Sequence, residues 1–125
     1  MKHFKFLFFI FIFFITSCSF FSYPEATSEV ISSYTKESDS YHYIYATIKI
    51  TNISDKNIYN SIICLKADST KRSYYKTTSL NITIKPGNSI YLTFDFSFEE
   101  NTNNKDSEKE KWIEDSVIIL DTVWN

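Results

Sequence analysis

Residues 90–98, with the sequence IYLTFDFSF, alternate without a break between large apolar side chains and a second set that is mostly polar. The apolar set shares one parity and consists of Ile90, Leu92, Phe94, Phe96 and Phe98. Side chains of a β-strand point to opposite faces in turn, so this period of two predicts a strand with one buried and one solvated face. Full burial of five such side chains contributes about 10 kcal/mol before the loss of chain entropy is subtracted.

A second alternating run lies in residues 41–53. Its apolar parity carries Ile44, Ala46, Ile48 and Ile50, and its other parity carries Tyr43, Tyr45, Thr47, Lys49 and Thr51. Weaker strand patterns occupy residues 28–35, 58–67, 74–75, 79–85 and 115–124. The only Gly of the chain stands in the turn Pro86-Gly87-Asn88, where Gly accepts the positive φ that the third turn position requires. Six or seven strands separated by polar turns, without a sustained helical period, predict an all-β antiparallel sandwich.

The beginning of the chain follows a different pattern. Residues 1–5 include Lys2 and Lys5, an unbroken apolar run (FLFFIFIFFI) fills residues 6–15, and no Asp or Glu occurs before Glu25. As a helix, this apolar run would span about 15 Å, which is about half of the hydrocarbon core of a bilayer. A basic start, a short apolar run and small residues after it predict a secretory signal peptide.

The residues that end this segment are Ile15-Thr16-Ser17-Cys18, and they resemble a bacterial lipobox, whose usual form is Leu-[Ala/Ser]-[Gly/Ala]-Cys. The resemblance implies cleavage before Cys18, diacylglycerol on its sulfur and a further acyl chain, such as palmitate, on its amine. Two or three acyl chains anchor a domain firmly, because each buried CH₂ contributes about 0.8 kcal/mol. The expected organisation is a lipoprotein signal peptide in 1–17, the lipidated cysteine and a tether in 18–40, and the β-sandwich in 41–125.

The two cysteines of the chain also allow a second interpretation, a disulfide between Cys18 and Cys64. The place of Cys18 directly after the apolar run favours lipidation. Cys64 lies in the apolar run Ile62-Ile63-Cys64-Leu65, which predicts a small buried hydrophobic residue. No base is near it in the sequence to activate the thiol.

Three segments of the predicted sandwich carry a second resemblance: Ile48-Lys49-Ile50-Thr51-Asn52-Ile53-Ser54, Ile84-Lys85-Pro86-Gly87-Asn88-Ser89 and Phe94-Asp95-Phe96. Their order is similar to that of small immunoglobulin-like modules in bacterial envelope proteins, FxLYD-type domains among them. Leu65-Lys66-Ala67-Asp68 stands where these modules usually carry a Phe/Tyr-Asp motif. The resemblance implies an immunoglobulin-like fold with a scaffolding or binding role.

Catalytic and metal-binding patterns are missing from the sequence. A single Gly excludes the glycine-rich phosphate loops, which need at least two. His42 is the only His after Cys18, whereas a zinc site needs three or four ligands and a hydrolase of the Ser-His-Asp type needs further partners. Residues 99–111 mix acidic and basic side chains without the spacing of a calcium loop, which predicts a solvated loop. We therefore expect no enzyme activity, no cofactor and no metal.

Three functional hypotheses remain. The first is a lipid-anchored envelope protein, bound to the bilayer through Cys18, with a structural or binding sandwich and an envelope or host protein as partner. The second is an exported periplasmic enzyme or small-ligand carrier of the same fold, and the third is a protein held by an uncleaved N-terminal membrane helix. The net charge of −2 argues against a nucleic-acid partner. Tyr43, Tyr45 and Tyr91 lie on polar parities, where they serve either cross-strand packing or a binding surface.

Overall fold

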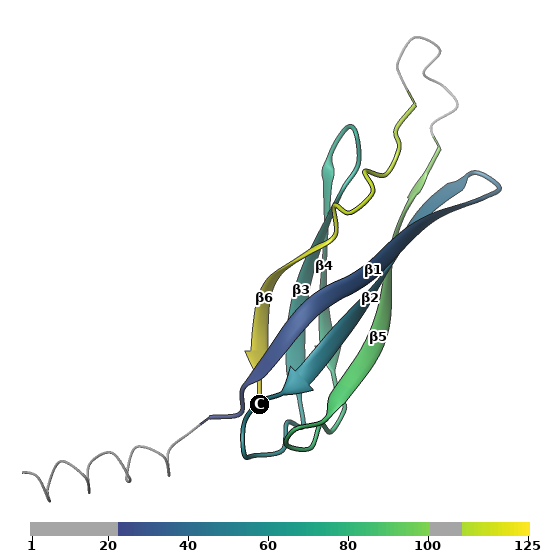
Figure 1. The fold of residues 1–125 in the computed structure, drawn as a ribbon. Coiled ribbons are helices and arrows are strands. Elements are labelled where there is room, and N and C mark those ends of the chain that lie inside the picture. Colours follow the sequence, from purple (N-terminus) through teal and green to yellow (C-terminus); the bar gives the residue numbers. More distant parts are fainter. Residues whose placement is uncertain (1–22, 101–108) are drawn as a thin grey trace, which may run out of the picture.

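The computed structural model describes residues 23–100 and 109–125. The predicted signal peptide, Cys18 and much of the predicted charged loop lie outside these residues. The described chain is all-β, and Figure 1 labels its strands. Their bounds are β1 (Ala26–Ser38), β2 (Tyr41–Asn52), β3 (Ser61–Asp68), β4 (Ser73–Leu80), β5 (Ser89–Glu99) and β6 (Ile118–Trp124). Among these residues no helix has the length and apolar character to span a membrane.

The strands form two antiparallel sheets of three, with the orders β1-β2-β5 and β4-β3-β6. The β1–β2 and β3–β4 hairpins each stay within one sheet. The chain crosses between the layers three times: from β2 to β3, from β4 to β5, which pairs with β2, and from β5 to β6, which pairs with β3. Figure 1 shows the two sheets as the layers of an elongated body. The predicted antiparallel β-sandwich is confirmed.

The two ends of this body differ, and we name them the tip and the base. The tip, at the top of Figure 1, holds the β1–β2 and β3–β4 turns and the end of β5. The base holds residues 23–25, the β2–β3 and β4–β5 connections and Asn125. Main-chain hydrogen bonds join the segments of the base, with Ile53 donating to Glu25 (3.0 Å) and Tyr59 donating to Asn125 (2.7 Å).

The core lies between the inner faces of the sheets. On β2 and β5 the predicted parities are confirmed: Ile44 lies opposite Phe96 and Ile48 opposite Leu92, and both isoleucines are fully buried. The other sheet contributes a second set of buried side chains, Ile63, Leu65 and Ala67 from β3. Ile58, Ile84, Trp112 and Val117, which lie outside the strands, complete the core.

One polar residue, Asn52, is also fully buried, at the base. Its side-chain amide donates to the carbonyl oxygens of Lys56 (2.7 Å) and Ile84 (2.8 Å). Its side-chain oxygen accepts from the main-chain N–H of Ser54 (2.9 Å) and from the Ser54 hydroxyl (2.6 Å). Asn52 thus joins the β2–β3 and β4–β5 connections, and its own buried amide group is fully paired.

The predicted turn at Pro86-Gly87 is confirmed, with Gly87 at a φ of 78°. Asn88 donates its main-chain N–H to the Lys85 carbonyl oxygen at 3.0 Å, which closes the four-residue turn. Gly87 itself donates to the main-chain oxygen of Asn52 at 2.9 Å, so the turn is bound to the end of β2.

The domain boundary expected at residue 41 is wrong, because β1 begins at Ala26 and pairs with β2 along its length. The strand pattern over 28–35 is weak, since β1 is an edge strand and its inward residues near the base are small, Ala26, Ser28 and Val30. A shift in register between Val30 and Ser32 also interrupts the period of two.

Two further expectations differ from the structure. The pattern over 79–85 predicted a strand, but β4 ends at Leu80, and Ile84 forms only an isolated bridge with Ile58 because the chain crosses here between the layers. Cys64 was expected in the core. It lies instead on the outward parity of β3, half-buried and as a free thiol, while its neighbours Ile63 and Leu65 point inward.

Candidate functional site

Four tyrosine rings lie side by side on the outer face of the β1-β2-β5 sheet, three of them stacked and the fourth, Tyr41, tilted. We call them the tyrosine ladder: Tyr34, Tyr41, Tyr43 and Tyr45. The rings of Tyr34 and Tyr45 have centroids 5.0 Å apart and planes that differ by 16°. Tyr43 follows at 5.9 Å from Tyr45, and Tyr41 at 6.3 Å from Tyr43. Offset aromatic pairs at these distances are favourable beyond the area they bury.

The register of the sheet builds the ladder. Tyr41, Tyr43 and Tyr45 occupy successive outward positions of β2, and Tyr34 on β1 lies directly opposite Tyr45. The ladder begins beside the β1–β2 turn and occupies the half of this face that is nearer the tip. Tyr34 is 57% exposed and Tyr41 is 43% exposed, whereas Tyr43 and Tyr45 are half-buried.

Of the three tyrosines singled out from the sequence, the structure brings Tyr43 and Tyr45 together. Tyr91 lies on the same face but outside the ladder, opposite Lys49. The Lys49 Nζ is 5.9 Å from the centre of the Tyr91 ring, which is the reach of a cation–π contact. Between Lys49 and Tyr45 stands Thr47, whose hydroxyl is 3.4 Å from that of Thr93. This face is therefore rich in hydroxyl groups, and charged side chains border the ladder, with Lys36 opposite Tyr43 and Asp95 opposite Tyr45.

The hydroxyl of Tyr45 is harder to ionise than an ordinary tyrosine. Desolvation raises its pKa, and the negative charge of Asp95, directly opposite on β5, raises it further. The neighbouring Tyr34 and Tyr43 act in the same direction. The raised pKa favours the neutral Tyr45 hydroxyl, which both donates and accepts hydrogen bonds.

A second group of side chains closes the open end of the sandwich at the tip. Trp112 is 9% exposed and packs against the rings of Tyr74 (4.9 Å between centroids), Phe98 (5.0 Å) and Phe96 (6.2 Å). Its indole Nε1 donates to the carbonyl oxygen of His42 at 3.0 Å. This aromatic cluster fixes the segment before β6 across both sheets.

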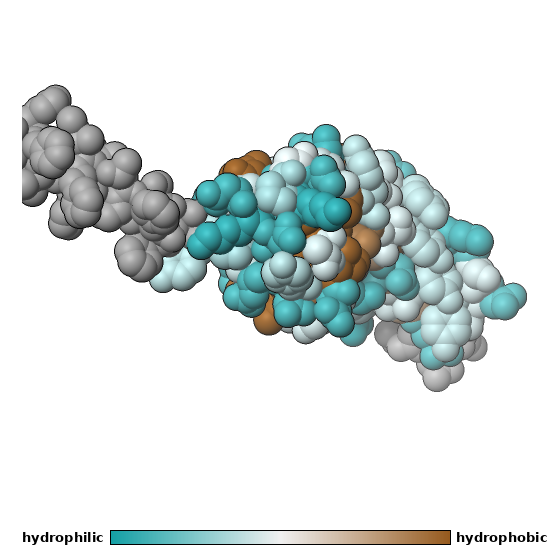
Figure 2. Space-filling model, turned by 90° about the horizontal axis from the view of Figure 1, so that it is seen from below, coloured by the Kyte–Doolittle hydropathy of each residue, from teal (hydrophilic) through white to brown (hydrophobic). Residues whose placement is uncertain are grey.

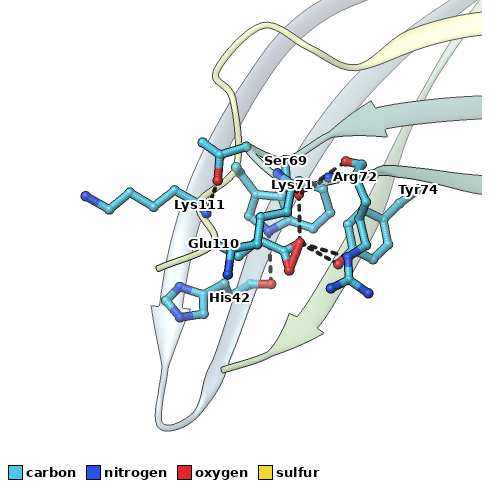
Figure 3. Close-up of polar contacts among 9 residues, drawn as sticks. His42, Ser69, Lys71, Arg72, Tyr74, Glu110 and Lys111 are labelled. Carbon is cyan, nitrogen blue, oxygen red and sulfur yellow. Dashed lines mark hydrogen bonds and ion pairs between the residues drawn. The ribbon is translucent and has the colours of Figure 1, made fainter. Parts of the chain in front are cut away.

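Glu110 holds the same segment by polar contacts, which Figure 3 shows. Its Oε2 accepts hydrogen bonds from the Tyr74 hydroxyl and the Ser69 hydroxyl, both at 2.7 Å, and lies 3.5 Å from the Arg72 Nε. Burial and the Glu110 carboxylate raise the pKa of Tyr74 to about 12. Because Glu110 is 13% exposed and has three partners, it serves as a structural clasp between the β3–β4 turn and the segment before β6.

His42 lies at the edge of this cluster. Its Nδ1 is 3.2 Å from Glu37 and its Nε2 is 3.9 Å from Glu100, while its ring stacks on Phe98 at 5.1 Å. A half-open pocket of about 150 Å³ adjoins it, lined by Thr35, Lys36, Glu37, His42, Tyr43, Lys111, Trp112 and Glu114. Small-molecule sites typically enclose about 300–1,000 Å³. Within residues 23–100 and 109–125, no three His, Cys, Asp or Glu side chains are grouped so as to hold a metal ion.

The sequence located part of this surface. It indicated the outward parity of Tyr43 and Tyr45, but it missed Tyr34 and Tyr41. Tyr41 stands on the same parity two residues before Tyr43, which is a signal that was available. Tyr34 required the pairing of β1 with β2. Comparisons of the chain with protein families, with curated proteins and with solved structures give no match.

Proposed function

We propose that the chain is a lipid-anchored protein of a bacterial cell envelope and that its β-sandwich is a non-catalytic binding domain. In this proposal residues 1–17 are a signal peptide that is removed, and Cys18 becomes the acylated first residue. The bilayer is one partner, through the acyl chains. The other is an envelope or host protein that contacts the tyrosine ladder.

The observation that carries this proposal is the position of the ladder relative to the base. The described chain begins at Tyr23, at the base and five residues after Cys18. The ladder lies on the half of the molecule nearer the tip, with Tyr41 beside the β1–β2 turn. An anchor at Cys18 therefore keeps the base near the bilayer and leaves the ladder accessible to a partner.

The chemistry of the ladder supports a protein as that partner. Tyrosine is enriched in protein interfaces because its ring supplies a large contact area and its hydroxyl a hydrogen bond. Tyrosine also supplies this contact area at a low cost in side-chain entropy. The rings of Tyr34, Tyr43 and Tyr45 are already held by stacking, which lowers the entropy lost on binding.

We also propose that the sandwich is immunoglobulin-like. The distribution of strands supports this, since the first, second and fifth strands share one sheet and the third, fourth and sixth share the other. This corresponds to strands A, B and E facing C, C′ and F of immunoglobulin sandwiches.

The test of the proposed anchor is metabolic labelling with a fatty acid in a bacterial host, comparing the unaltered chain with Cys18→Ala. Cys64→Ala is the matched control, since it removes the other thiol. We expect label in the unaltered chain and in Cys64→Ala, and none in Cys18→Ala. An unlabelled chain refutes the proposal. Intact mass of the membrane fraction separates the alternatives, because retention of residues 1–17 would identify an uncleaved membrane helix instead.

A further inference from the structure

The base of the sandwich exposes large side chains from three separate segments. Tyr23 is 84% exposed, Ile53 57% and Tyr59 55%. Main-chain hydrogen bonds hold two of these segments, since Ile53 donates its N–H to Glu25 at 3.0 Å and Tyr59 donates its own to Asn125 at 2.7 Å. Figure 2 views the molecule from this end and shows separate hydrophobic patches between hydrophilic residues. We call these three side chains the basal rim.

The residue types of the rim suit the boundary between lipid and water. Tyrosine is enriched where a protein meets the headgroup region of a bilayer, since its ring is apolar and its hydroxyl remains hydrated. An isoleucine that is 57% exposed, as Ile53 is, gains by leaving water. The charges around the rim are balanced: Lys56 and Lys85 are exposed, as are Glu25 and Asp55. Neither attraction to anionic lipid nor repulsion from it is therefore expected to dominate.

The length of chain between Cys18 and the rim is short. Tyr23 is the fifth residue after Cys18, and a fully extended chain of five residues spans at most about 18 Å. An acyl group in the bilayer would hold the base within that distance of the surface, at a high effective concentration. This step rests on the proposed acylation of Cys18.

From these observations we infer that the basal rim of Tyr23, Ile53 and Tyr59 rests in the headgroup region of the bilayer. The lipid surface is thus a second, non-covalent contact of the protein beside its acyl chains. This contact orients the domain, because it holds the base down and turns the β1–β2 and β3–β4 turns away from the membrane.

The inference is tested on the full-length acylated chain with a fluorophore on one engineered thiol. In a Cys64→Ser background, the acylated sulfur of Cys18 does not react, so Ile53→Cys accepts the label at the rim and Ser38→Cys accepts it near the tip. Both positions are exposed, so neither change disturbs the core. The protein is reconstituted into phosphatidylcholine vesicles that carry a quencher on the lipid headgroups.

We expect strong quenching and a blue shift for the label at position 53 and neither effect at position 38. Equal quenching at both positions, or none at position 53, overturns the inference. A second arm places the label at Lys85→Cys, on the base but outside the rim. There, the double change Ile53→Ser and Tyr59→Ser should remove most of the quenching, and unchanged quenching also overturns the inference.

Intact mass of the same sample separates this failure from failure of the proposed function. If the chain is acylated but the label on its base is not quenched, the proposed anchor stands and only the role of the rim is refuted. A chain without acyl groups refutes the anchor, and with it the rim contact that depends on it.

Discussion

The indole Nε1 of Trp112 donates a 3.0 Å hydrogen bond to the main-chain oxygen of His42, and this bond joins the segment before β6 to the start of β2 in the opposite sheet. His42 is the second residue of β2, close to the β1–β2 turn. The contact closes the tip of the sandwich between its two layers. Its loss should therefore affect the whole domain.

We expect Trp112→Phe to lower the free energy of unfolding by about 1–2 kcal/mol, because it keeps most of the ring but removes the donor to His42. Trp112→Ala also leaves a cavity against Tyr74 and Phe98, and should cost about 3–5 kcal/mol. Urea unfolding followed by circular dichroism measures both values. Equal losses in the two variants would contradict the separate contribution of the hydrogen bond.

The Tyr74–Glu110 contact predicts a dependence of stability on alkaline pH. The pKa of Tyr74 is raised to about 12 from 10.0, so the unfolded chain releases this proton at a lower pH than the folded one. The resulting stabilisation is fully present below pH 10 and is lost as the pH rises through about 12; its size is on the order of 1–2 kcal/mol.

Urea unfolding at a series of pH values between 9 and 12 measures this loss. Tyr74→Phe is the control, since it retains the ring and removes the ionising hydroxyl. The stability of the variant should fall less steeply over this range than that of the unaltered chain. Parallel curves would show that Tyr74 does not contribute to the pH dependence.

Asn52→Leu should destabilise the base by about 2–4 kcal/mol. The substitution removes one of the donors to the carbonyl oxygens of Lys56 and Ile84, and it removes the acceptor of Ser54. Asn81→Ala is the matched control, because Asn81 is exposed, and it should change stability by no more than about 0.5 kcal/mol. Urea or thermal unfolding of both variants measures these losses. Similar losses in free energy of unfolding for the two would be inconsistent with this role of Asn52.

The tyrosine ladder predicts a coupling that depends on position. In a double-mutant cycle, Tyr34→Ala and Tyr45→Ala should show an interaction energy of about 0.5–1.5 kcal/mol, because their rings stack at 5.0 Å. The same cycle with Tyr91→Ala and Tyr45→Ala should be additive within about 0.5 kcal/mol, since Tyr91 contacts Lys49 instead. Coupling of equal size in both cycles would argue against a discrete ladder.

The sequence predicted best the strands that contribute one long buried face. On β2 and β5 every inward position from Ile44 to Ile50 and from Ile90 to Phe98 carries an apolar side chain, so the period of two is visible without knowledge of the partner strand. On β3 both parities carry apolar residues around Cys64. Ile62 is 39% exposed on the outer face, so the run gave no indication of which residues point inward.

The candidate site was predicted less completely because it depends on pairing. The parity of Tyr43 and Tyr45 is a property of one strand, whereas the place of Tyr34 depends on the register shift between Val30 and Ser32. The burial of Glu110 arises only when the segment after β5 returns to the β3–β4 turn. Nothing in the charged sequence of residues 99–111 distinguishes Glu110 from its neighbours.

The order of the strands has a consequence for how the domain folds. The β4-β3-β6 sheet is incomplete until β6 pairs with β3. This pairing joins residues that are far apart in the sequence, such as Cys64 and Asp121. Because contacts between neighbouring segments alone cannot complete the sandwich, folding is expected to be slow.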